Sequence, residues 1–177
     1  MNKEAFLKVI VLLLITLLTI TVKADPAPFG LVLNTTTAEE LKSKYPVNSL
    51  GINKNNGLEA FDIDPKNIDF EGLISAKAAF SRDGILKIVQ MTLPKQKFED
   101  IFNSLSKKYT LVYKNIPFDG NKEAKFAMDN TYILLYAPKN NPEMDFLYIN
   151  KKLLEEALQI KPAMAENAKR EKETNQL

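Results

Sequence analysis

The chain of 177 residues contains no histidine, no cysteine and no tryptophan, and it has only six glycines. Without histidine and cysteine, the sequence has no Ser-His-Asp triad, no cysteine nucleophile and none of the usual histidine or thiolate metal sites. It also has no disulfide, so a hydrophobic core must stabilise the fold. The glycines are dispersed and form no phosphate-binding loop. We therefore expect a protein that is not an enzyme and holds neither a cofactor nor a metal ion.

Arginine is scarce as well, and lysine carries almost all of the positive charge. Residues 1–24 contain Lys3, Lys8 and Lys23 against Glu4, which accounts for the whole formal net charge of +2. The rest of the chain is formally neutral, so it has no overall electrostatic attraction to nucleic acid or to an anionic membrane. We expect no nucleic-acid partner.

The N-terminal 24 residues have the pattern of an export signal. Lys3 and Lys8 precede an apolar run from Val9 to Val22, and Ala24 supplies the small residue before a cut at Asp25. A membrane anchor is the alternative, but the run is shorter than the roughly 20 apolar residues that span a bilayer. We predict cleavage near Ala24, a periplasmic or secreted protein, and no stable membrane insertion afterwards. The abundance of lysine and asparagine is typical of AT-rich bacterial genomes.

The remaining chain is predicted to form one domain at residues 25–160, followed by a flexible polar tail at 161–177. Two similar strings suggest an internal repeat: LKSKYPV at Leu41–Val47 and LSKKYTLV at Leu105–Val112. The domain is therefore either a single unit or a tandem of residues 28–94 and 95–160. Two helix ends that pack an aromatic residue on a sheet would also produce such an echo.

Local patterns predict an α+β fold with an antiparallel sheet and helices packed mainly on one face. Thr37 and Glu40 have the spacing of a capping box, and residues 94–109 carry an apolar stripe at helical spacing. The predicted helices cover residues 35–46, 94–109 and 151–160. The predicted strands cover 58–64, 73–81, 85–93, 110–116, 123–129, 131–137 and 144–150. Residues 25–34 are predicted to be extended, and 48–57 to be a loop. In the last helix, the residues predicted to face inward are Leu153, Leu154, Ala157 and Leu158.

The opening PFGLVLNTTTAEELKSKYP, followed by a meander of strands, resembles small exported bacterial proteins of β-lactamase-inhibitor-like or SmpA/OmlA-like architecture. The resemblance covers the layout of residues 28–160. It implies short helices on one face of an antiparallel sheet, and a role in binding other proteins or in envelope assembly. The chain departs from the inhibitor pattern because it lacks cysteine and tryptophan, so inhibition of a β-lactamase is not carried over.

Two motifs are compatible with chemistry. Ser104 and Lys107 form a Ser-x-x-Lys pair, in which lysine could activate serine, but the partner motifs of that enzyme class are missing and both residues fit a solvated helix face. The stretch 62–71 offers four carboxylates as oxygen ligands for calcium, but it lacks the spacing of an EF-hand loop. An exposed acidic loop after a strand explains the same residues: Asp62, Asp64, Asp69 and Glu71.

The distinctive feature is a group of aromatic residues on the late strands. Residues 131–137 and 144–150 are apolar on both faces, which is more than a sheet with one solvated face requires. The second face is either covered by the protein's own elements or exposed as a binding patch. The predicted protein-binding residues are Tyr113, Tyr132, Tyr136, Phe146 and Tyr148.

Three functions follow as hypotheses. The first is a non-catalytic exported protein that binds another protein through a sheet face, as an inhibitor, adaptor or envelope assembly factor. The second is a periplasmic carrier of an apolar small molecule, which requires a cavity larger than packing leaves. The third is a hydrolase that uses Ser104 and Lys107, which requires both side chains to line one cleft. The sequence leaves the oligomeric state open.

Overall fold

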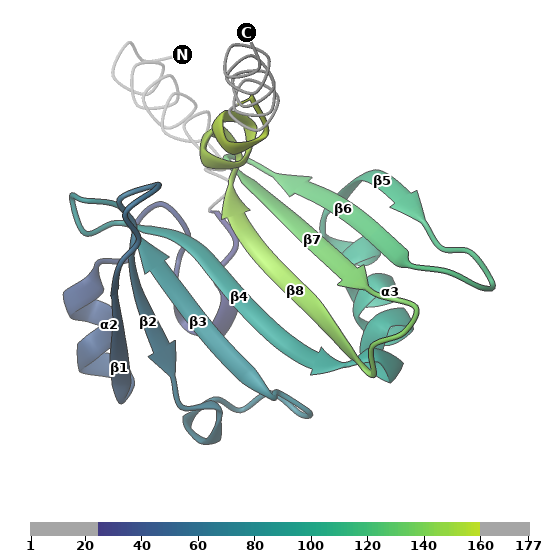
Figure 1. Cartoon of the computed structure of the whole chain (residues 1–177), viewed down its shortest axis with the longest axis horizontal. Helices are drawn as coiled ribbons and strands as arrows, with labels where there is room; N and C mark the ends of the chain where they lie inside the picture. The colour runs from purple at the N-terminus through teal and green to yellow at the C-terminus, as the bar shows by residue number, and fades with distance from the viewer. Residues whose placement is uncertain (1–24, 160–177) are drawn as a thin grey trace, which may run out of the picture.

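The computed structural model describes residues 25–159 (Figure 1). The predicted leader, residues 1–24, and the predicted tail, residues 161–177, lie outside the described residues. Within the described part, no helix combines the length and the hydrophobicity that crossing a membrane requires.

The first half of the described chain contains a short helix followed by four strands. Helix α2 spans Ala38–Lys44, and the predicted capping box begins it: the Thr37 hydroxyl accepts from Glu40 N–H at 3.2 Å, and the Glu40 carboxylate accepts from Thr37 N–H at 2.7 Å. The strands are β1 (Val47–Ile52), β2 (Glu59–Ile63), β3 (Ser75–Phe80) and β4 (Leu86–Pro94). Short 3-10 turns occur at η1 (Pro28–Gly30) and η2 (Pro65–Asn67).

The second half repeats this order of elements. A 3-10 turn, η3 (Lys95–Lys97), leads into helix α3 (Phe98–Lys108). The strands are β5 (Thr110–Asn115), β6 (Lys122–Met128), β7 (Thr131–Ala137) and β8 (Glu143–Asn150). A further helix begins at residue 151 and is described as far as residue 159.

All eight strands form one antiparallel sheet, in the order β1-β2-β3-β4-β8-β7-β6-β5. The last strands of the two halves, β4 and β8, pair at the centre, and the first strands, β1 and β5, are the two edges. Helix α3 packs on β6 and β7, and α2 packs on the same side of the sheet through Leu41 (Figure 1). The predicted α+β class with an antiparallel sheet and helices mainly on one face is confirmed.

The two similar strings occupy equivalent places in the two halves. Tyr45 N–H donates to the Leu41 carbonyl at 2.9 Å, and Tyr109 N–H donates to the Leu105 carbonyl at 2.8 Å, each at the end of its helix. Both leucines are buried, and both tyrosines have the extended backbone that starts the following edge strand. The echo therefore marks the same helix-to-strand corner in each half.

The two edge strands also share an irregularity. The pairing of β1 with β2 skips Leu50, and the pairing of β5 with β6 skips Val112. Each bulge follows the residue that pairs with a buried phenylalanine, Phe61 in β2 and Phe126 in β6. Bulges twist an exposed edge and hinder its pairing with another chain.

Three local predictions differ from the structure. Residues 47–52, predicted mostly as loop, form the edge strand β1. The opening at 25–34 is not extended throughout, because η1 turns at Pro28–Gly30 with Phe29 at a φ of 57°. In the helix from residue 151, Leu158 was predicted to face inward but is 53% exposed.

The hydrophobic core lies between the sheet and the two helices. Alternate residues of the six inner strands point to this side, which we call the helix face, and most of them are almost completely buried. In the second half, Phe102 of α3 lies between Phe98 and Phe126, with ring centroids 6.3 and 5.6 Å away. Phe126 is fully buried. A shift of β6 by one residue would move this ring to the other face of the sheet, so burial of Phe126 fixes the register.

Asp25 anchors the start of the described chain to the second half of the sheet. Its carboxylate accepts hydrogen bonds from the Asn34 side-chain amide at 3.0 Å, from Asn130 N–H at 3.2 Å and from the Thr131 hydroxyl at 3.0 Å. Asn34 in turn accepts from the Asn150 side chain at 2.7 Å. Thr131 is completely buried, so its hydroxyl needs such a partner.

Candidate functional site

The side of the sheet opposite the helices, which we call the open face, has an apolar centre. Leu147 of β8 pairs in register with Gln90 of β4 on one side and with Leu134 of β7 on the other. Ile88, two residues before Gln90 on β4, lies on the same face because side chains alternate along a strand. Ile88, Leu134 and Leu147 are half-buried although no described helix packs on them.

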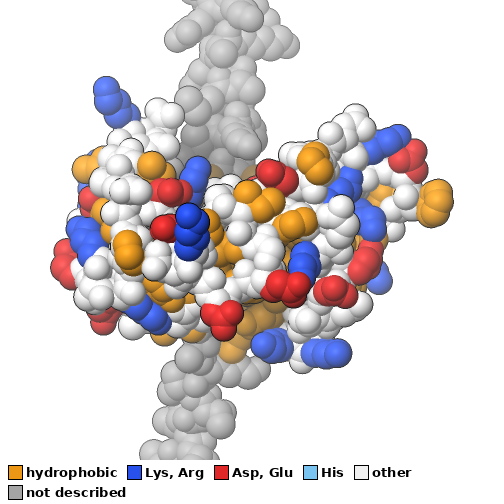
Figure 2. All heavy atoms as spheres, turned by 90° about the horizontal axis from the view of Figure 1, so that it is seen from below, with side chains coloured by type: hydrophobic (Ala, Val, Ile, Leu, Met, Phe, Trp, Pro, Cys, Tyr) orange, Lys and Arg blue, Asp and Glu red, His pale blue; other side chains and the backbone are white. Residues whose placement is uncertain are grey.

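This centre is concave. A hollow of about 340 Å³ is lined by Ile88, Gln90, Leu134, Tyr136, Asp145 and Leu147. A second hollow of about 190 Å³, nearer to β2 and β3, shares Ile88 and Gln90 with the first. Figure 2 shows the surface dipping between the two ends of the molecule, with hydrophobic side chains in the dip. The open face is therefore better suited to bind a protruding part of a partner than a flat surface.

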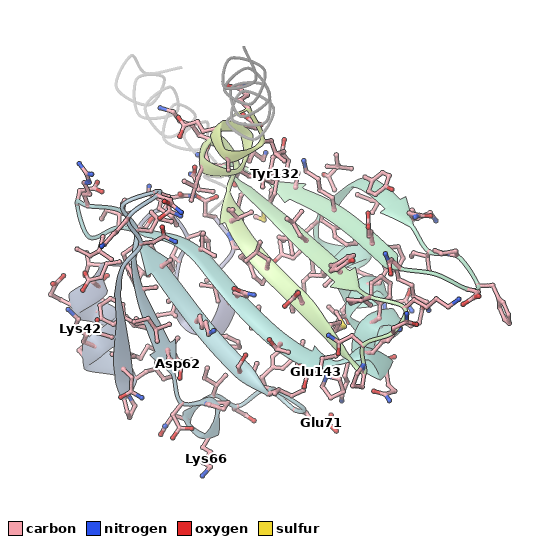
Figure 3. All side chains as sticks on the ribbon, viewed as in Figure 1. Lys42, Asp62, Lys66, Glu71, Tyr132 and Glu143 are labelled. Atoms are coloured by element: carbon pink, nitrogen blue, oxygen red, sulfur yellow. The ribbon has the colours of Figure 1, made fainter. Side chains whose placement is uncertain are left out.

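Tyr132 and Tyr136 lie on the open face, as their alternation along β7 predicted. Tyr136 borders the larger hollow and is 38% exposed. Tyr132 is engaged by its own chain: Lys125 and Lys151 place their ammonium groups 3.6 and 5.3 Å from its ring centroid, and its hydroxyl donates to Glu155 at 3.2 Å (Figure 3). Desolvation and the Glu155 carboxylate raise the pKa of Tyr132. Tyr136 is thus the more available ring.

Two exposed aromatic residues lie toward the β5 edge. Tyr113, another predicted binding residue, pairs in register with Lys125 and is 49% exposed. Phe118, in the loop between β5 and β6, is fully exposed and was not among the predicted binding residues. Tyr113 therefore lies on the β5 edge next to the open face, and Phe118 lies in the loop beyond the end of β5.

Phe146 and Tyr148 do not belong to this surface. They point to the helix face and are only 3% and 8% exposed, because Phe146 pairs with Leu135 and Tyr148 with Ile133, both buried under the helices. The predicted set of five aromatic residues is therefore divided between the two faces of the sheet. Sequence reasoning had not combined Ile88 and Gln90 with Tyr136, since their proximity depends on the pairing of β4 with β8.

Burial of Tyr148 has an electrostatic consequence. Desolvation strongly raises the pKa of its phenol, and the neighbouring Tyr109 phenol raises it further. Burial also raises the pKa of Tyr109. The fold therefore holds Tyr148 in its neutral form.

We expect the stability of the protein to fall as the pH rises above 10.0, the ordinary pKa of tyrosine. Below that pH Tyr148 is neutral in both states and its contribution is complete; above it the unfolded chain ionises while the folded chain resists, so the balance shifts toward unfolding. Urea unfolding at a series of pH values should show a shallower decline for Tyr148→Phe than for the parent. Equal declines would contradict this assignment, since lysine deprotonation is common to both proteins.

Charged residues surround the apolar centre of the open face. Strand alternation and register place four carboxylates and two lysines there: Asp62, Glu123, Glu143, Asp145, Lys77 and Lys125. Asp62 lies on β2 and Glu143 at the start of β8 (Figure 3). Within the described part of the chain none of these carboxylates forms an ion pair, although Gln90 donates to Asp145 at 3.4 Å. The open face therefore carries an excess of negative charge.

Ser104 and Lys107 both lie on α3, and the four carboxylates of 62–71 form no single cluster among the described residues. Ser104 borders a cleft on the helix side, but Lys107 is not among the residues that line it. Asp64 accepts from Lys66 N–H at 3.0 Å, and Glu71 pairs with Lys97 at 2.9 Å. Among the described residues, no three acidic side chains converge as metal ligands.

Comparisons of the chain with models of protein families, with curated proteins and with solved structures gave no match.

Proposed function

We propose that the chain is an exported, non-catalytic protein that binds another protein through the open face of its sheet, as an inhibitor, adaptor or envelope assembly factor. The observation that supports this most directly is the hollow bounded by Ile88, Leu134, Leu147 and Tyr136. Apolar side chains with tyrosine at their border are the composition expected at the centre of a protein interface. The layout is also the one implied by the resemblance to exported helix-plus-meander proteins.

The shape and charge of the open face favour one kind of partner. A concave apolar centre is complementary to a protruding loop with an apolar residue at its tip. Unpaired carboxylates, Asp145 and Glu143 among them, attract lysine or arginine beside that tip. The proposed partner is therefore a protein with an exposed loop that is apolar at the tip and basic at its flanks.

Export remains part of this proposal. A cut before Asp25 would leave intact the carboxylate that accepts from Asn34, Asn130 and Thr131. The described fold would thus keep its anchor in the processed protein. Envelope and extracellular proteins are consequently the pool in which the partner should be sought.

The test is affinity capture of envelope and culture-medium proteins on the immobilised chain, with a Leu134→Ala, Tyr136→Ala double variant beside the parent. Both substitutions reduce the apolar area of the hollow, and truncation of a hot-spot side chain at the centre of an interface weakens binding by about 2 kcal/mol or more. Phe118→Ala is the matched control, because it removes an exposed aromatic side chain away from the hollow.

We expect a partner that the parent and Phe118→Ala retain and the double variant loses while still folded. Its binding to the parent should weaken with added salt, and Asp145→Asn should reduce that dependence. A partner lost equally with Phe118→Ala, or one retained by the folded double variant, would contradict binding through the open face. Capture of no partner by the parent would also contradict binding through the open face.

A further inference from the structure

A separate cleft lies on the helix face of the sheet, away from the two hollows of the open face. This helix-side cleft has a volume of about 490 Å³, within the range of small-molecule sites. One wall is helix α3, with Ile101 and Leu105; the other is the connection between β2 and β3, with Phe70. Its remaining aromatic lining comes from β8 and from the end of α3. Binding in this cleft is independent of the function proposed for the open face.

Four of the twelve residues that line the cleft are aromatic. Phe70, Tyr109, Phe146 and Tyr148 all contribute, and the rings of Phe146 and Tyr148 have centroids 5.0 Å apart. The phenol of Tyr148 is buried beside that of Tyr109, and burial holds it in its neutral form. What the rings offer to a bound molecule is therefore apolar area and the negative potential of their faces.

The protein's own lysines use such ring faces elsewhere. Ammonium groups lie 3.6 to 5.6 Å from the ring centroids of Phe61, Tyr45, Phe98 and Tyr132. In the described part of the chain, none of the four rings of the cleft has a lysine in this position. The cleft thus presents aromatic faces that no internal cation occupies.

The rim adds carboxylates to these rings. Asp69, Glu71 and Asp100 border the cleft together with Lys97 and Lys108. Lys97 forms an ion pair with Glu71 at 2.9 Å. The other charged residues at the rim are Asp69, Asp100 and Lys108, so their sum is negative. Ring faces attract a cation through their negative potential, and carboxylates attract it through their charge. Together they favour the binding of an organic cation.

We propose that the helix-side cleft binds a small organic ammonium compound. Its apolar body lies on the aromatic floor, in contact with Ile101, Leu105 and Phe146. Its ammonium group lies at the edge of the aromatic floor, against a ring face and toward Asp69 and Asp100 at the rim. A neutral molecule of the same shape would use only the floor, and an anion would be repelled by the carboxylates.

The test compares three probes of similar size and shape: phenethylammonium, phenethyl alcohol and hydrocinnamate. Each is titrated into the isotope-labelled protein, and backbone amide shifts are followed by NMR. We expect saturable shifts at Ile101, Leu105 and Tyr109, with the ammonium probe binding about tenfold more tightly than the alcohol and hydrocinnamate more weakly than both. Equal affinities for ammonium and alcohol, or shifts confined to other regions, would overturn the proposal.

Rim variants separate charge recognition from folding, since they leave the aromatic floor unchanged. Asp69→Asn with Asp100→Asn should remove most of the preference for ammonium over alcohol, and Lys108→Gln should increase it. Asp62→Asn, which changes a carboxylate on the open face, is the matched control and should leave all three affinities unchanged. An effect of the control as large as that of the rim variants would refute a local cation site.

Discussion

Replacement of Phe126 by alanine is expected to lower the free energy of unfolding by about 3–5 kcal/mol. Phe126 is fully buried on β6, and its ring centroid is 5.6 Å from that of Phe102 on α3. Alanine would leave a cavity between the sheet and α3, because neighbouring strands are held in register on both sides. Urea unfolding followed by circular dichroism measures the loss.

Phe118→Ala is the matched control for this prediction. The residue lies eight positions earlier in the same hairpin and is fully exposed, so its removal should change stability by no more than about 0.5 kcal/mol. Because both variants remove the same phenyl ring, the difference between them measures its burial. Similar losses for the two variants would show that β6 does not direct Phe126 into the core.

The elements that sequence patterns predicted are those with local signals. Thr37 and Glu40 specify the start of α2 within four residues, and the apolar stripe of α3 repeats at helical spacing. Strand β1 has no such signal. Its residues from Asn48 to Ile52 are all exposed and contain a glycine and a bulge, so the strand owes its place to pairing with β2, which no local pattern reveals.

The candidate binding surface was predictable along each strand but not between strands. Alternation correctly placed Tyr132 and Tyr136 together on one face of β7. Whether Tyr148 of β8 joins them depends on register, and the observed pairing of Tyr148 with Ile133 sends it to the opposite face. A shift of one residue would have reversed this outcome.

The helix-side cleft was not predicted from the sequence. It requires Phe70, from the connection before β3, to stand opposite Ile101 of α3, about thirty residues later, while β8 supplies the floor. Such a site exists only once the connection and the helix both cover the same side of the sheet. Two of its aromatic residues, Phe146 and Tyr148, were predicted to bind a partner, but together with Tyr132 and Tyr136 of the other face.

Replacement of Asp25 by alanine is the second prediction with a large expected effect, a loss of about 2–3 kcal/mol in the free energy of unfolding. The carboxylate accepts three hydrogen bonds, and its removal leaves the buried Thr131 hydroxyl without that acceptor. Hydrogen exchange should also become faster at the Asn130 amide, which donates directly to Asp25.

Asp119→Ala provides the comparison, because Asp119 makes a single exposed ion pair with Lys139 at 2.8 Å. An exposed pair of this kind contributes about 0–1 kcal/mol, so a much larger loss is expected at Asp25. Asp25 connects the beginning of the first half to the turn before β7 in the second half, so the effect should extend to both halves. Equal losses for the two variants would mean that the sheet alone holds the halves together.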